Sequence, residues 1–158
     1  MIGVLKAAER DGMILDNPAK LLPNRKLPRI EIQIPTHEQF RSLIKQMRLA
    51  DSRGIHGAYL VELLAYSGMR LNEAVNLLWD DINFDRGCFN VTGGEYGTKN
   101  HEIRTVPLFP AMRELLERIR SGRTEIDSDH VTPIKGARTL MASAAKKAGI
   151  PRFTHHSL

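Results

Sequence analysis

Residues 67–82, SGMRLNEAVNLLWDDI, mark a break in the chain from which the fold can be worked out. The stretch before them, from about Ala58 to Tyr66, is almost entirely apolar and predicts a helix buried on all sides. Ser67 and Gly68 interrupt this helix, and a second helix is expected from about Leu71 to Leu78. We therefore expect two core helices joined by a tight junction.

An arginine stands at this junction. Arg70 follows Gly68 directly, and an arginine held beside the backbone N–H groups of a helix start is well placed to bind a phosphate. Glu73 comes three residues later on the same helical face and can orient the guanidinium. The other interpretation is an ordinary Arg–Glu pair on the surface, which contributes well under ~1 kcal/mol. Spacing alone leaves both interpretations open.

The flanking segments predict a mainly α-helical fold with one small antiparallel β-sheet, which is the α+β class. THEQ at 36–39 fits a capping box, and a stripe of apolar residues at helical spacing follows it: Phe40, Leu43, Ile44 and Met47. The stretches CFNVT (88–92) and EIRTVPL (102–108) predict a hairpin or a three-stranded sheet. Further helices are expected at 2–11, from Asn17 to about Leu22, from Pro110 with Met112, Leu115, Leu116 and Ile119 inward, and from about 137 to 148.

The composition bounds the class of protein. The 158 residues are enough for one domain, or for one domain plus the edge of another. No apolar run is long enough to cross a bilayer, and the N-terminal residues lack a secretory pattern. Cys88 is the one cysteine, which excludes an intramolecular disulfide and favours a reducing cytosol. The net charge of +5 favours a polyanionic partner.

The basic residues are concentrated near the N-terminus. Residues 17–30, NPAKLLPNRKLPRI, include four basic side chains and no acidic one: Lys20, Arg25, Lys26 and Arg29. Prolines punctuate this stretch and predict a linker or an extended strap, so we place a domain boundary here. Beside nucleic acid such a segment would neutralise phosphates and release counterions. A solvated linker is the other interpretation.

Two more segments contain residues of chemical interest. In TKNHEIRTVPL, residues 98–108, Lys99 falls at or just beyond a hairpin turn, where a side chain can reach a groove, although solvated hairpin lysines are common. The ending FTHHSL places His155 and His156 where another helix would begin. No HExxH or His-x-His spacing occurs, and the cysteine lies in a predicted strand, so we expect no metal site.

In their order and residue pattern, the three segments resemble motifs of the tyrosine recombinases, the phage-integrase family. SGMRLNEAVNLLWDDI is similar to the family's first arginine box, in which Thr/Ser-Gly-x-Arg precedes an acidic residue at +3 and then Leu, Trp and Asp-Ile. GTKNHEIRTVPL is similar to its lysine hairpin, x-Lys-x-x-x-x-Arg-x-Val-Pro-Leu. AGIPRFTHHSL is similar to the approach to its second box, His-x-Leu-Arg-His. The likeness covers roughly residues 36–158.

The resemblance implies a partial catalytic domain. Residues 31–158 would be an incomplete catalytic domain, and residues 1–30 would be the end of a core-binding domain with a basic interdomain linker. The final HSL matches His-x-Leu of the second box, whose arginine would come next. The family's later histidine or tryptophan and its nucleophilic tyrosine would follow. The three tyrosines of this chain precede the second box, so we expect the chain alone to be inactive.

The resemblance also implies a chemistry, namely site-specific DNA recombination or integration by strand cleavage and rejoining through a 3′-phosphotyrosyl intermediate, without a metal or other cofactor. Arg70 would bind the non-bridging phosphate oxygens and Lys99 would protonate the departing 5′-oxygen. His156 would donate a hydrogen bond to the phosphate or accept the proton of the nucleophile, and Glu73 would support Arg70. Contacts with duplex DNA would come from Lys20, Arg25, Lys26, Arg29 and Arg104.

The family further implies self-association on DNA, in a bacterial or phage protein of the cytoplasm that associates with the nucleoid and serves a mobile element or a chromosome. The alternative is a non-catalytic DNA-binding protein or regulator of the helix-turn-helix kind. The break at Ser67 and Gly68 and the basic charge fit that alternative. A lysine hairpin followed by a histidine box does not.

Overall fold

The computed structural model describes residues 2–21, 33–51, 53–92, 103–123 and 129–158. The chain divides into two compact units, residues 1–31 (unit 1) and residues 32–158 (unit 2), each of which is described by itself. In unit 1, helix α1 spans Ile2–Arg10, and Gly12 follows it with a left-handed φ of 70°. The assignment of unit 1 to the end of a core-binding domain stays a prediction.

The second short helix expected in unit 1, from Asn17 to about Leu22, is wrong as far as the structure describes this segment. Residues 18–21 form a turn, in which the backbone N–H of Lys20 donates to the carbonyl of Asn17 at 3.0 Å. The Asn17 side chain accepts a hydrogen bond from the N–H of Ala19 at 2.9 Å. This is the bond that an N-cap side chain makes, so the expected cap is present, but the residues after it form a turn.

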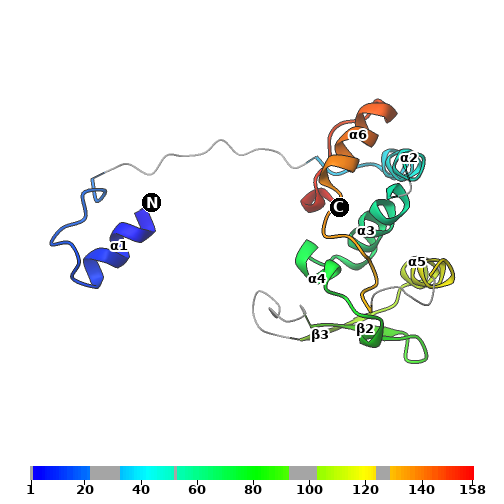
Figure 1. Ribbon diagram of the computed structural model, residues 1–158, viewed down its shortest axis with the longest axis horizontal. Coiled ribbons are helices and arrows are strands. Elements are labelled where there is room, and N and C mark those ends of the chain that lie inside the picture. Colours follow the sequence, from blue (N-terminus) through cyan, green and yellow to red (C-terminus); the bar gives the residue numbers. More distant parts are fainter. Residues whose placement is uncertain (1, 22–32, 52, 93–102, 124–128) are drawn as a thin grey trace. The chain divides into compact units, whose positions relative to one another are not determined.

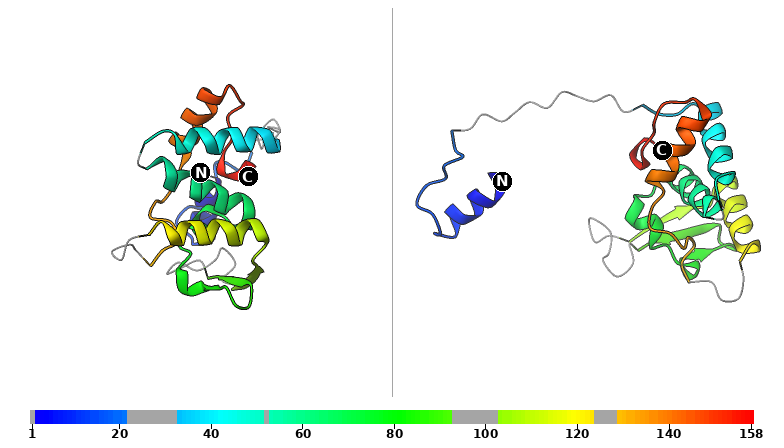
Figure 2. Two further views of the ribbon diagram at one scale, coloured as in Figure 1. Left: turned by 90° about the vertical axis from the view of Figure 1, so that its right-hand side faces the viewer. Right: turned by 45° about the horizontal axis from the view of Figure 1, so that its top comes forward.

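Unit 2 is mainly helical with a small antiparallel sheet, as expected from the sequence. Within the described residues the sheet has three strands in the order β1-β2-β3, with Phe89 opposite both Ile82 and Val106 (Figures 1 and 2). No helix in this part of the chain has the length and apolar character needed to cross a membrane. The elements are α2 His37–Arg48, α3 Gly54–Ser67, α4 Leu71–Val75, η1 Trp79–Asp81, β1 Ile82–Asn83, β2 Cys88–Val91, β3 Arg104–Pro107, α5 Pro110–Ser121, α6 Arg138–Ala148 and η3 His155–Ser157.

Helix α3 is the centre of unit 2 and contacts α2, α4, α5 and α6. Its apolar residues from Ala58 to Leu64 are buried on every side, which confirms the expected central position. The helix begins at Gly54, earlier than the expected Ala58. A Cβ on Gly54 would clash with the carbonyl oxygen of Met47, and one on Gly57 would clash with Leu140. The two glycines therefore belong to the helix and allow its first turn to approach α2 and α6.

Helices α2 and α5 follow the apolar pattern of the sequence closely. The capping box at the start of α2 is confirmed, since Thr36 and Gln39 each accept a hydrogen bond from the backbone N–H of the other. A buried glutamate of α3 joins these helices: Glu62 accepts a hydrogen bond from Arg48 at 2.6 Å and lies 3.6 Å from Arg118. Residues expected on buried faces are buried in both helices: Leu43, Ile44, Met47, Met112, Leu115, Leu116 and Ile119.

Helix α4 ends at Val75, whereas the sequence pattern predicted a helix to Leu78. The residues after it pair with a distant segment. The carbonyl of Leu77 accepts from the N–H of Val131 at 2.9 Å, and the N–H of Trp79 donates to the carbonyl of Asp129 at 3.0 Å. Leu78 and His130 form an antiparallel bridge between these bonds. This long-range pairing replaces the last helical turn.

The junction between α3 and α4 is held by the backbone. Gly68 ends α3 in the left-handed conformation, with a φ of 63°, and its N–H donates to the carbonyl of Leu64 at 3.0 Å. The Ser67 hydroxyl donates to the carbonyl of Leu63 and accepts from the N–H of Met69 at 3.2 Å. Met69 is buried. The position of Arg70 is therefore fixed by the residues before it.

We expect Gly68→Ala to lower the free energy of unfolding by about 1–2 kcal/mol, because a left-handed φ is unfavourable for a residue with a Cβ. Nothing lies within 4 Å of that Cβ position, so the effect is one of backbone conformation. Gly68→Asn should cost less, since asparagine tolerates this region. Urea denaturation followed by circular dichroism measures the loss.

Gly136→Ala is the matched control, because that glycine also has no atom within 4 Å of its Cβ position and lacks a left-handed φ. Equal losses for Gly68→Ala and Gly136→Ala would show that the left-handed conformation does not hold the junction.

Candidate active site around Arg70 and Glu73

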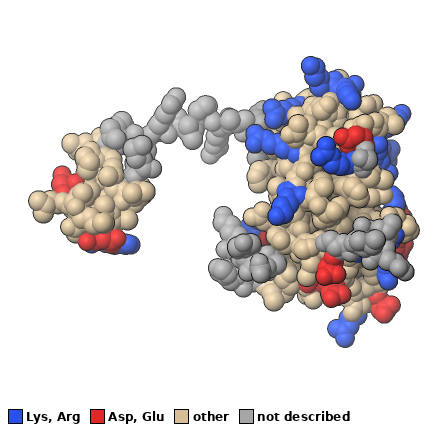
Figure 3. Space-filling view, viewed as in Figure 1, with Lys and Arg blue, Asp and Glu red and all other residues tan. Residues whose placement is uncertain are grey.

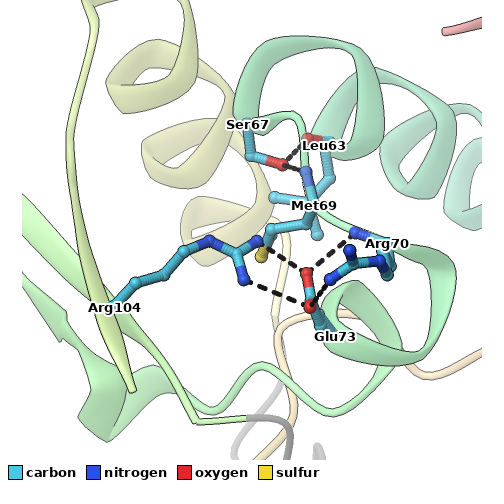
Figure 4. Close-up of polar contacts among 6 residues, drawn as sticks. All are labelled: Leu63, Ser67, Met69, Arg70, Glu73 and Arg104. Atoms are coloured by element: carbon cyan, nitrogen blue, oxygen red, sulfur yellow. Dashed lines mark hydrogen bonds and ion pairs between the residues drawn. The ribbon is translucent and has the colours of Figure 1, made fainter. Parts of the chain in front are cut away.

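The Glu73 carboxylate is the centre of the site and is almost fully buried, with a side-chain exposure of 4%. From the described residues it accepts four hydrogen bonds (Figure 4). Oε1 accepts from Nη1 of Arg70 at 3.2 Å and from Nη1 of Arg104 at 3.1 Å. Oε2 accepts from the backbone N–H of Arg70 at 2.9 Å and from Nη2 of Arg104 at 2.6 Å. The acceptor capacity of a carboxylate is thereby filled.

This geometry bears on one of the two interpretations that the sequence left open, the ordinary surface pair, and the phosphate-binding role of Arg70 stays a prediction. The Arg70–Glu73 pair is present, but its acid is buried, so the pair is not an ordinary surface contact. The buried carboxylate also binds the backbone of Arg70, which begins α4. Glu73 therefore fixes both the main chain and one guanidinium nitrogen of the arginine.

Two arginines keep the buried carboxyl group ionised. The pKa of Glu73 lies at about 2, below its ordinary value of 4.5, chiefly because Arg104 donates hydrogen bonds to the charged form. Burial opposes this shift, and the backbone N–H and the guanidinium of Arg70 add to it. The same interaction raises the pKa of Arg104. Glu73 is therefore charged throughout the physiological pH range.

The two guanidinium groups differ in how they are held. The Arg70 side chain is 58% exposed and gives one hydrogen bond to Glu73. The Arg104 side chain is 40% exposed and grips both carboxylate oxygens in the bidentate manner. Because a guanidinium has five N–H donors, Arg70 retains donors that face solvent while one edge is fixed.

Arg104 stands at the start of β3, 31 residues after Glu73. Figure 4 shows it reaching Glu73 from the sheet, on the opposite side of the carboxylate from Arg70. The sequence predicted a DNA contact for Arg104 and did not pair it with Glu73. The apolar neighbours of Glu73, Leu71 and Ala74, signal that a charge here is buried and needs more than one partner, but they do not identify that partner.

The C-terminal residues form the turn η3, on the same side of unit 2 as α4 and the start of β3 (Figures 1 and 2). His156 is exposed, and its predicted role stays a prediction. His155, for which no role was predicted, is half-buried, and its Nε2 accepts from the N–H of Ala137 at 3.4 Å. Burial, then His156 and Arg138, lower the pKa of His155. His155 therefore anchors η3 to the start of α6.

Several predicted site residues lie outside the described part of the chain, namely Lys99, Arg25, Lys26 and Arg29. Lys20 is described, and its ammonium group pairs with Glu9 at 3.1 Å and with Asp16 at 3.2 Å. Both pairs are within unit 1. Among the described residues, no group of three or more His, Cys, Asp or Glu side chains is arranged to hold a metal ion.

We expect Glu73→Gln to flatten the acid limb of the stability curve. The lowered pKa means that ionised Glu73 stabilises the fold above its ordinary pKa of 4.5, and that this contribution is lost as the pH falls toward about 2. The loss is on the order of 2 kcal/mol, since both arginines are partly solvated. Urea denaturation at intervals from pH 6 to about 2 measures it.

Glu114→Gln, at an exposed glutamate of α5, is the control and should leave the acid limb unchanged. If Glu73→Gln followed the same pH profile as the unmodified chain, Glu73 would not be the group that titrates.

The sequence of this chain is similar to those of known proteins over most of its length. The Phage integrase family matches residues 34–158. Tyrosine recombinase XerD of Neisseria meningitidis serogroup B is 30% identical over an alignment 166 positions long, which covers 95% of this chain and 54% of the relative. The chain thus spans about half the length of the curated relatives that it matches.

Solved structures share the fold. A λ integrase dimer bound to a COC′ core site has a TM-score of 0.74 at 15% identity and covers 99% of this chain and 46% of its own. A λ integrase tetramer bound to a Holliday junction has a TM-score of 0.71 at 16% identity, covering 95% of this chain and 45% of its own. With a family match over most of unit 2, this chain belongs to the phage integrase family, the tyrosine recombinases.

Proposed function

We propose that this chain contributes part of the DNA strand-cleaving and rejoining site of a site-specific recombinase that acts through a 3′-phosphotyrosyl intermediate. The observation that supports this best is that Arg70 is restrained and at the same time exposed. Its main chain and one guanidinium nitrogen are fixed on a buried carboxylate, while more than half of its side chain is exposed. A cation preorganised in this way can stabilise charge that develops on a phosphate.

The proposed reaction is nucleophilic attack on a phosphodiester. A tyrosine oxygen, from a residue not present in this chain, forms a bond to phosphorus, and the bond from phosphorus to the 5′-oxygen breaks. Arg70 binds the non-bridging oxygens, whose negative charge increases in the transition state. Lys99 gives a proton to the departing 5′-oxygen, and His156 donates to the phosphate or takes the proton of the tyrosine. Rejoining is the reverse attack by a 5′-hydroxyl.

Duplex DNA is the proposed substrate. Figure 3 shows Lys and Arg side chains gathered over the upper part of unit 2, around α6, whose exposed basic residues are Arg138, Lys146 and Lys147. The basic segment of residues 17–30 would add phosphate contacts. The ion pairs of Lys20 with Glu9 and Asp16 are exposed, so exchanging them for a phosphate costs little.

Assembly on DNA is part of the proposal. The two λ integrase structures contain a dimer on a core site and a tetramer on a Holliday junction, and this chain shares their fold. We infer that the protein to which this chain belongs also acts as a multimer that exchanges strands between two duplexes. A cytoplasmic protein that associates with the nucleoid fits this activity.

We expect Arg70→Ala to reduce strand cleavage by about 10³-fold, because removal of one preorganised donor of an oxyanion costs on that order. DNA binding should change by less than about threefold, since many phosphate contacts share the affinity. The assay uses a protein that combines this chain with the segment bearing the nucleophilic tyrosine, and a nicked substrate that traps the covalent complex.

Arg86→Ala is the control, because Arg86 is an exposed arginine of the turn between β1 and β2. It should cleave at the normal rate. Equal losses of binding and cleavage in Arg70→Ala would contradict the assigned role. A source gene that continues beyond codon 158 without a tyrosine would leave the non-catalytic DNA-binding alternative.

We expect Lys99→Ala to block cleavage of ordinary DNA and to regain activity on DNA with a 5′-thiolate leaving group, which departs without a proton. The ratio of the two cleavage rates is the measurement. Arg70→Ala should show no such rescue, since its defect concerns the phosphate oxygens. A failure of the thiolate substrate to rescue Lys99→Ala would remove Lys99 as the general acid.

A further inference from the structure

The hydrogen bonds at Glu73 are divided evenly between two arginines. Each carboxylate oxygen accepts one bond from Arg70 and one from Arg104. Both bonds of Arg104 come from its guanidinium. Arg70 gives one bond from its guanidinium and one from its main-chain N–H. Arg104 therefore supplies the more complete counter-charge, and it is the largest cause of the lowered pKa of Glu73.

This division matters once Arg70 binds a phosphate. A guanidinium that turns toward a phosphate weakens or gives up its bond to Glu73, and a buried carboxylate without a cation is strongly unfavourable. With Arg104 in place, Glu73 keeps two charged bonds and the backbone N–H of Arg70. Without Arg104, the Arg70 guanidinium would be the one charged group bonded to Glu73 among the described residues, and its release would cost the full pairing energy.

We propose that Arg104 is a positioning residue that frees Arg70 to bind phosphate by holding the charge of Glu73, and that it does not act as a DNA contact itself. The inference rests on the proposed role of Arg70 as the phosphate-binding cation. Its basis is geometric, since the Nη1 and Nη2 atoms of Arg104 both donate to Glu73 while the Arg70 side chain gives that carboxylate one bond.

The test is a double-mutant cycle on this chain, with inorganic phosphate as the probe. The Nε–Hε NMR signal of Arg70, identified by its loss in Arg70→Lys, reports phosphate binding. Arg104→Met removes the cation but keeps an unbranched side chain, and it should weaken phosphate binding at Arg70 by roughly tenfold or more. Adding Glu73→Gln should restore the affinity to within about threefold, because no buried charge then retains Arg70.

Two controls separate this mechanism from a simple effect of net charge. Glu114→Gln, at an exposed glutamate of α5, removes one negative charge outside the site and should change phosphate affinity by less than about threefold. A gain in Glu114→Gln as large as the loss in Arg104→Met would indicate a field effect and overturn the inference. Arg104→Lys keeps the charge but loses the bidentate grip, so it should fall between the unmodified chain and Arg104→Met. If Arg104→Met does not fold, Arg104→Lys replaces it in the test.

The carboxyl ¹³C signal of Glu73 gives a readout that a DNA contact would not change. In Arg104→Met the pKa of the Glu73 carboxyl group should rise from the value of about 2. If the Arg70 signal of the unmodified chain does not respond to phosphate, the proposed function fails and this inference fails with it. If that signal responds but Arg104→Met binds equally well, or Glu73→Gln does not restore binding, the inference alone is overturned.

Discussion

Burial of a negative charge is the constraint on which the functional part of this molecule depends. An ionised carboxylate inside a protein requires cationic partners that bind it with good geometry. The bonds that satisfy the carboxylate also hold those cations in place. Glu73 fixes Arg70 at the start of α4 and Arg104 at the start of β3 in this way. Glu62 joins α3 to Arg48 of α2 and Arg118 of α5 by the same means. Two buried acids thus connect the helices of unit 2 with one another and with the sheet.

The apolar core supplies the rigid support behind this polar site. Helix α3 is buried along most of its length and ends in a left-handed glycine, so the chain leaves the core in one direction. Arg70 is the second residue after that glycine, with Met69 buried between them. The exposed guanidinium therefore extends from a backbone that the core, the Ser67 hydroxyl and the Glu73 carboxylate all restrain. Arg70 thus combines a restrained backbone with a side chain that is 58% exposed.

The local features of this fold could be predicted from the sequence, and the long-range pairings could not. Apolar spacing identified α2 and α5, and the Thr36 capping box located the start of α2. The helix predicted from Leu71 to Leu78 was too long because Leu77, Leu78 and Trp79 pair with residues about 50 positions later. No local pattern reveals such a distant partner. The start of α3 was expected at about Ala58, whereas the helix begins at Gly54, and its first two glycines pack closely against Met47 and Leu140.

The same limit applies to the site. Both Glu73 and Arg104 lie in segments that resemble recombinase motifs, but which cation meets which acid depends on how the sheet is placed against α4. Local spacing therefore paired Arg70 with Glu73 correctly and left Arg104 without its partner. The anchoring of η3 by His155 was hidden for the same reason, since Ala137 lies 18 residues away.

The position of Trp79 gives unit 2 an optical signal of its own. It is the one tryptophan of the sequence, and it lies half-buried where η1 meets the segment around His130. The guanidinium of Arg123 stands 5.1 Å from the centre of its ring, and its indole N–H is buried without a hydrogen-bond partner among the described residues. Exposure to water will move its emission to longer wavelength. Tryptophan fluorescence therefore follows the unfolding of residues 32–158 without a contribution from residues 1–31.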